Sequence, residues 1–140
     1  MKRTMIVIAA SALVLATPLH GQSAAMTPAQ AIAAATSASS GQVSGVFEFV
    51  VGSTGASGYN VYLNSAEDYK DPANLTAELH AEVNNKLHTK LGAFAQDVLK
   101  GKRVRIKGVA KRVPIERRDG SKYFQTRIDV DTLDQIEILN

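Results

Sequence analysis

The chain is 140 residues long with a formal net charge of +3, a length that accommodates one domain and excludes two of ordinary size. Hydrophobic residues make up 45% and charged residues 21%, a balance that permits a packed core and argues against wholesale disorder. Because the sequence has no cysteine, a disulfide scaffold, a thiolate metal site and a catalytic cysteine are excluded.

The first 25 residues have the organisation of a secretory signal peptide. Two basic residues follow Met1, and an apolar stretch over residues 5–16 comes next. This stretch is too short for a permanent membrane span, so an uncleaved anchor is the less favoured alternative. Small residues mark three candidate cleavage positions, after Gly21, Ser23 or Ala25. We expect a periplasmic or secreted mature protein with no stable membrane insertion after cleavage.

The positive charge is concentrated in one stretch of the sequence. Residues 100–127 carry 11 basic and 2 acidic residues, whereas residues 26–99 carry 3 basic and 7 acidic ones. The tail from residue 128 has 4 acidic residues and no basic one. The distribution therefore predicts a local basic surface rather than a generally basic protein.

Residues 26–41 are predicted to form a helical and flexible segment before the main domain, residues 42–140. Thr27 can cap a helix whose first position is Pro28, and alanines continue it to residue 35. The Ser- and Gly-rich stretch 36–41 has the composition of a linker.

Three strands are predicted next. Residues 42–51 alternate, with both faces fairly apolar. The Gly-rich residues 52–58 have the composition of a flexible turn. Alternation of apolar and polar residues then predicts strands over residues 59–64 and 74–79, separated by a polar loop.

The period then changes to that of an amphipathic helix. Val83, Leu87 and Leu91 recur at i, i+4 and i+8, with polar residues between them. We expect this helix to break near Gly92 and to resume through residues 94–99, with Phe94 continuing the apolar stripe.

Two further strands complete the predicted elements. Residues 103–113 alternate, with Gly108 as an expected bulge, and a polar turn over residues 117–121 follows. The last strand covers residues 123–130 and is expected to continue through residues 136–138 past a short turn.

This order of elements predicts a mostly β chain with a five-stranded OB-fold-like barrel and an α-helix between strands 3 and 4. The apolar stripe that contains Leu87 would then close one end of the barrel. A five-stranded α+β sheet is the alternative, but it explains less well why the first strand is apolar on both faces.

Three stretches also resemble recurrent pieces of bacterial OB-fold domains of the nucleic-acid-binding type. They are GYNVYLN at residues 58–64, LKGKRVRIKG at residues 99–108 and IDVDTLDQIEI at residues 128–138. Many such domains are exported. The resemblance covers residues 42–140 and implies the fold more strongly than a function, because this fold carries many kinds of ligand site.

Motifs for catalysis or metal binding are incomplete in the sequence. The glycines of residues 52–58 lack a following Gly-Lys-Ser/Thr, and residues 129–134 lack the central Gly and closing Glu of a calcium loop. His80 and His88 are eight residues apart, without the i, i+4 spacing of a helical zinc pair. The acid- and arginine-bearing motifs of secreted nucleases are also missing, and no spacing in the sequence singles out a Ser-His-Asp triad. We therefore predict no enzyme activity, no metal site and no cofactor.

The basic stretch is the remaining functional feature, because cations on a strand face suit the phosphates of a polymer. Two tyrosines could supply stacking platforms for bases. The candidate ligand-binding residues are Arg103, Arg105, Lys107, Lys111, Arg112, Arg117, Arg118, Lys122, Tyr62 and Tyr123.

We therefore predict an exported, non-enzymatic module that binds an extended anionic polymer, either single-stranded nucleic acid or an envelope polymer. The alternative is an envelope protein–protein interaction or structural module with no nucleic-acid ligand. A third reading assigns the basic residues to a solvated surface that protects strand edges.

Overall fold

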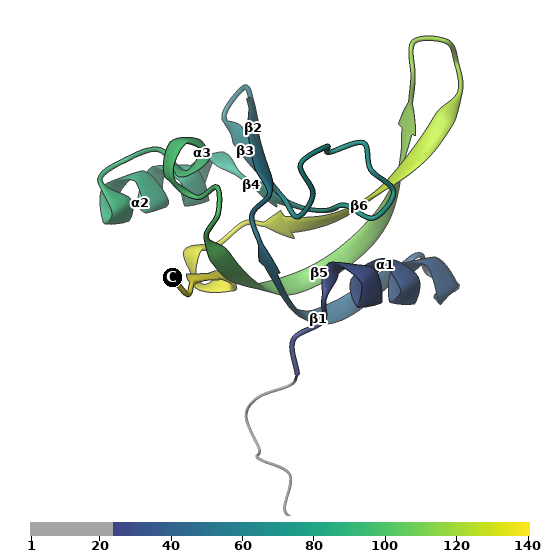
Figure 1. The fold of residues 1–140 in the computed structure, drawn as a ribbon, viewed down its shortest axis with the longest axis horizontal. Coiled ribbons are helices and arrows are strands. Elements are labelled where there is room, and N and C mark those ends of the chain that lie inside the picture. The colour runs from purple at the N-terminus through teal and green to yellow at the C-terminus, as the bar shows by residue number, and fades with distance from the viewer. Residues whose placement is uncertain (1–23) are drawn as a thin grey trace, which may run out of the picture.

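The computed structural model describes residues 24–140, so the predicted signal peptide lies almost entirely outside the described residues. The strands form one sheet, and the helices lie around it (Figure 1). The elements are α1 (Pro28–Ser37), β1 (Gln42–Val50), β2 (Ser53–Ser57), β3 (Asn60–Asn64), β4 (Leu75–Leu79), α2 (Ala81–Leu91), α3 (Ala95–Val98), β5 (Arg103–Glu116), β6 (Lys122–Val130), the 3-10 helix η1 (Leu133–Gln135) and β7 (Ile136–Ile138).

The sheet has seven strands, with six in the order β1-β5-β6-β4-β3-β2 and β7 paired to β5. Among the strand pairs of residues 24–140, β4–β6 is parallel and the other five are antiparallel. The prediction of a mostly β chain is confirmed. The predicted five-stranded barrel is wrong in its strand count, and the sheet is not closed by strand pairing.

The two additional strands come from segments with weak sequence signals. Residues 53–57, predicted as a turn, form β2 because their backbone pairs with β3 around the turn at Gly58. Residues 136–138 pair with β5 instead of extending β6. The predicted helix lies between β4 and β5, so the presence of β2 places it after the fourth strand instead of the third.

The long strand β5 runs through Gly108 without the expected bulge. Its register with β1 is unbroken from Gln42↔Lys111 to Val50↔Arg103. A Cβ atom on Gly108 would lie 3.1 Å from the Cγ2 atom of Ile128, so glycine at this position permits close packing of β5 against β6.

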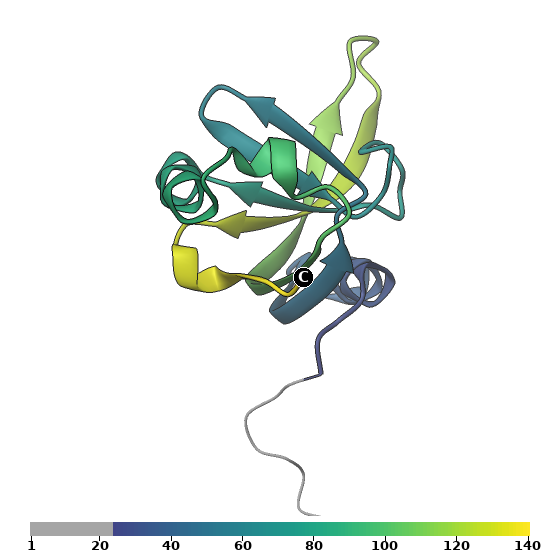
Figure 2. The ribbon, with the colours of Figure 1, turned by 60° about the vertical axis from the view of Figure 1, so that its left-hand side comes forward.

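The core lies between the inward faces of the strands, where Phe47, Ile106 and Ile128 are fully buried. Helix α1 packs on β1 and β5 and places Ala31 in this core, whereas α2 lies on a separate side of the strands (Figure 2). The Thr27 hydroxyl accepts a hydrogen bond from the Gln30 backbone N–H, which caps α1 as predicted. Within residues 24–140, no helix has the length and apolar content needed to span a bilayer.

The apolar stripe of α2 is buried as predicted, except at its end. Val83 and Leu87 are fully buried, and Leu91 packs against the core. Gly92 ends the helix with φ +71°, which confirms the predicted break. Phe94, expected on the stripe, is 55% exposed and lies against the His88 ring, with 4.3 Å between ring centroids.

Candidate ligand-binding groove

A groove of about 420 Å³ lies beside the outward faces of β3, β4 and β6. Strand alternation places its polar residues there, because Tyr62 and Thr76 flank the buried Leu63 and Ala77 on adjacent strands. Strand β2 and the loop after β3 supply the other walls. The lining residues are Ser53, Thr54, Gly55, Ala56, Ser57, Tyr62, Asn64, Glu67, Tyr69, Thr76, Gln125 and Arg127.

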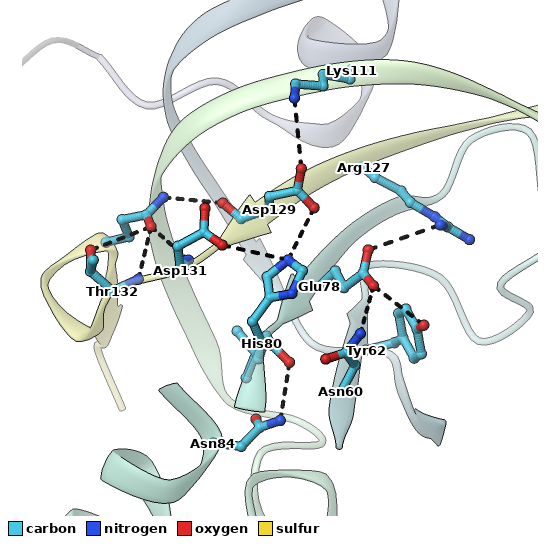
Figure 3. A network of polar contacts seen from close by, with 12 residues as sticks. Asn60, Tyr62, Glu78, His80, Asn84, Lys111, Arg127, Asp129, Asp131 and Thr132 are labelled. Atoms are coloured by element: carbon cyan, nitrogen blue, oxygen red, sulfur yellow. Dashed lines mark hydrogen bonds and ion pairs between the residues drawn. The ribbon is translucent and has the colours of Figure 1, made fainter. Parts of the chain in front are cut away.

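Polar contacts hold Tyr62 and Arg127 in this groove (Figure 3). The Glu78 Oε1 atom accepts hydrogen bonds from the Asn60 side-chain amide at 3.1 Å and from the Tyr62 hydroxyl at 3.4 Å. The Glu78 Oε2 atom lies 3.9 Å from Nη1 of Arg127, whose guanidinium is 5.8 Å from the centroid of the Tyr62 ring. The Arg127 Nε–H donates to Gln125 Oε1 at 3.0 Å, so both groove residues are oriented before any ligand arrives.

The loop after β3 is fixed by a buried cluster of amides and hydroxyls. The Asn74 side-chain amide donates to the Thr76 hydroxyl, which donates to Asn64 Oδ1 at 2.8 Å. The Asn74 Oδ1 atom accepts the Ala66 backbone N–H at 3.0 Å. Because these polar groups are buried and hydrogen-bonded, they hold the loop in a fixed conformation as one wall of the groove.

The first three predicted basic residues lie on the outer face of β5. Arg103, Arg105 and Lys107 alternate with the buried Val104 and Ile106, as predicted. Two of them contact one carboxylate on β1. The Glu48 oxygens lie 3.0 Å from Arg105 Nη2 and 3.8 Å from Arg103 Nη1, so these cations are partly neutralised within the protein.

This ion pair predicts the effect of reversing one charge. Glu48 and Arg105 are directly opposite in the β1–β5 register, so Arg105→Glu would place two carboxylates side by side. We expect the free energy of unfolding to fall by about 0.2–1 kcal/mol relative to Lys107→Glu, measured by urea denaturation. Equal stabilities of the two variants would contradict a structural role for the Glu48–Arg105 pair.

Other predicted cations lie along the second half of β5 and the hairpin that follows. Lys111 Nζ is 3.7 Å from Asp129 Oδ2. The Arg112 guanidinium lies 3.5 Å from the centroid of the Phe124 ring. Since residue 112 has the same parity as the inward-facing Ala110, it belongs to the opposite side of β5 from Lys111.

The hairpin between β5 and β6 extends away from the rest of the sheet (Figure 1). At its tip, the Asp119 carboxylate accepts hydrogen bonds from the hydroxyl and the backbone N–H of Ser121, which lower the pKa of Asp119. Gly120 adopts φ +85°, and Arg118 and Lys122 on either side are exposed. The turn is therefore ordered by its own polar groups.

A second cleft lies between this hairpin, helix α1 and the loop after β3. Three of the predicted ligand-binding residues line it, namely Arg112, Arg117 and Tyr123. The Arg117 guanidinium lies 4.4 Å from the centroid of the Tyr123 ring. The lining residues are Ile32, Thr36, Lys70, Pro72, Arg112, Arg117, Tyr123, Phe124 and Thr126. The ten predicted site residues are thus spread over separate regions of the molecule.

Sequence reasoning missed several groove residues. Gln125 and Arg127 carry the same outward alternation on β6 that identified Tyr62 on β3, and this signal could have found them. Tyr69 lies in a loop without periodicity, so no comparable pattern marks it.

Three titratable side chains also gather at the ends of β4 and β6. Ligand atoms of Glu78, His80 and Asp129 lie within 4.8 Å of one another. From the sequence, His88 is the one residue considered as a metal-binding partner of His80, whereas the structural neighbours of His80 are Glu78 on β4 and Asp129 on β6.

No family model matches the sequence, and no curated protein matches it either. Among solved structures, a mitochondrial single-stranded DNA-binding protein of S. cerevisiae is similar with a TM-score of 0.42 and 18% identity, over 70% of this chain and 91% of that one. A candidate aspartyl-tRNA synthetase of Leishmania major Friedlin is similar with a TM-score of 0.45 and 9% identity, over 87% of this chain and 22% of that one. Similarity this distant leaves the function to be inferred from the chain's own residues.

Proposed function

We propose that this protein is an exported, non-enzymatic binding module of the OB-fold type that holds single-stranded nucleic acid across the groove. In such barrels, oligonucleotides bind on the face of the second and third strands, between the loop after the first strand and the last hairpin loop. If β1 and β2 count as one bent first strand, β3 and β4 are those strands, and they border the groove.

The observation that carries this proposal is Tyr62 in the groove with Arg127 beside its ring. A half-buried ring held by Glu78 is a stacking platform that binds any base through its π face. The guanidinium of Arg127 can contact a phosphate, and the exposed cations Arg118 and Lys122 on the hairpin extend the positive field. The excess of basic residues over 100–127 supports a polyanion in preference to a neutral ligand.

Fluorescence anisotropy with a labelled oligothymidylate tests the proposal. We expect Tyr62→Ala to weaken binding by about 5–150-fold, because stacking of one base contributes about 1–3 kcal/mol. The salt dependence of binding should stay the same, since stacking releases no counterions. Arg118→Ala should instead make the log–log salt slope shallower by about 0.7 if this cation neutralises one phosphate.

Tyr59→Ala is the matched control, because Tyr59 is 84% exposed and lies outside the groove lining. It should bind the oligonucleotide as the wild type does. Absence of wild-type binding at low salt would contradict the proposal, and an envelope protein partner would then be the function to test.

A further inference from the structure

The cluster at the ends of β4 and β6 is built by a parallel strand pair. Glu78 lies opposite Asp129 in the register, and the His80 backbone N–H donates to the Val130 carbonyl at 3.1 Å, which continues the ladder. Alternation then places the side chains of Glu78, His80, Asp129 and Asp131 on one face of two adjacent strands. These strands are rigid elements, which favours a fixed arrangement of ligand atoms.

The separations around the His80 ring are close to those in a small metal's ligand shell, and a Glu78 oxygen lies within 4.8 Å of the His80 and Asp129 ligand atoms. The Nε2 atom of His80 is 3.3 Å from Asp129 Oδ1 and 3.7 Å from Asp131 Oδ1 (Figure 3). Zinc binds imidazole nitrogen and carboxylate oxygen at about 2.0–2.2 Å in a tetrahedron, so neighbouring ligand atoms stand about 3.3–3.6 Å apart. A cation could therefore be accommodated with small side-chain rotations.

Two of the three carboxylates, those of Asp129 and Glu78, also contact side chains outside the cluster. Lys111 Nζ is 3.7 Å from Oδ2 of Asp129, the oxygen other than the one near His80. Asn60, Tyr62 and Arg127 contact the Glu78 carboxylate. Such contacts orient ligating carboxylates in metal sites. The three carboxylates outnumber the two basic side chains Lys111 and Arg127, so negative charge is left to attract a cation.

We propose that His80, Asp129, Asp131 and Glu78 form a binding site for a divalent transition cation of the zinc class. The imidazole distinguishes this class from calcium and magnesium, which prefer shells made of oxygen alone. Side-chain exposures of 36% for His80 and 41% for Asp129 leave the site open to solvent, so water can complete the coordination. The site does not depend on the proposed nucleic-acid function.

Isothermal titration calorimetry of the full chain with zinc chloride at neutral pH tests this site, with calcium chloride and magnesium chloride as comparison ions. We expect one equivalent of zinc to bind. His80→Ala and Asp129→Asn should each weaken zinc binding by more than about 100-fold, because loss even of an outer partner changes affinity by about 10–100-fold. Cobalt chloride should give a visible absorption band in the wild type that His80→Ala abolishes.

His88→Ala is the matched control, because His88 is exposed on α2 and lies outside the cluster. It should bind zinc as the wild type does. If His80→Ala does not fold, judged by its circular dichroism melt, Asp131→Asn replaces it, since that side chain is 70% exposed. Absence of saturable zinc heat, unchanged affinity in the cluster variants, an equal loss in His88→Ala, or binding of calcium without zinc would each overturn the assignment.

Discussion

Leu87→Ala is expected to lower the free energy of unfolding by about 2–5 kcal/mol, as large-to-small changes in cores do. Leu87 is fully buried on the inward stripe of α2, next to Val83 one turn earlier. Removing its isobutyl group takes away contacts and leaves a cavity that the strands beneath cannot fully close. Urea denaturation with linear extrapolation measures the change.

His88→Ala on the adjacent, exposed position is the control. Its ring lies against Phe94, so we expect a loss of about 0.5–1 kcal/mol, above a bare surface change but well below that of Leu87→Ala. The opposite order of the two variants would show that α2 presents its other face to the core.

The elements predicted correctly are those in which the spacing of apolar residues along the sequence reflects which face is buried. In strands β3 to β6 apolar residues alternate with polar ones because the apolar face of each strand packs in the core, and α2 repeats Val83 and Leu87 at helical spacing for the same reason. Strand β2 has no such signal. This Ser-, Thr- and Gly-rich segment becomes a strand because its backbone pairs with β3. Backbone hydrogen bonds of this kind do not require particular side chains, so the sequence does not show them.

The candidate sites depend on contacts between distant parts of the sequence, and this limited their prediction. Tyr62 was predicted as a platform, but its neighbours Glu78 and Arg127 become partners only through the register of three strands. Similarly, local spacing gives His80 no metal-binding partner, and the parallel β4–β6 pair brings Asp129 to it. Alternation predicts Arg103, Arg105 and Lys107 on one face of β5, whereas grouping the later basic residues by proximity in sequence does not separate Lys111 from Arg112, which lie on opposite sides of this strand.

A glycine at the junction of β1 and β2 connects the fold to the groove. The Val51 backbone N–H donates to the Lys102 carbonyl, whereas the next N–H, of Gly52, donates to Asn64 on β3. The chain thus changes from the β5 side of the sheet to the β3 side within one residue. A Cβ atom on Gly52 would lie 2.8 Å from the Ser65 carbonyl oxygen and 2.9 Å from the Ala66 carbonyl carbon.

Gly52→Ala is therefore expected to lower the free energy of unfolding by about 1–3 kcal/mol, as overpacking does. The neighbours are backbone atoms of a loop that Asn74 anchors, so relief of the clash requires movement of β2, and with it a wall of the groove. Gly55→Ala, two residues into β2 in the same wall, is the control. Its Cβ would meet only the Tyr62 Cδ2 atom at 4.0 Å, an ordinary contact, so the stability should stay the same or rise by up to about 1 kcal/mol. Urea melts of both variants distinguish them, and equal stabilities would contradict a steric requirement for glycine at the junction.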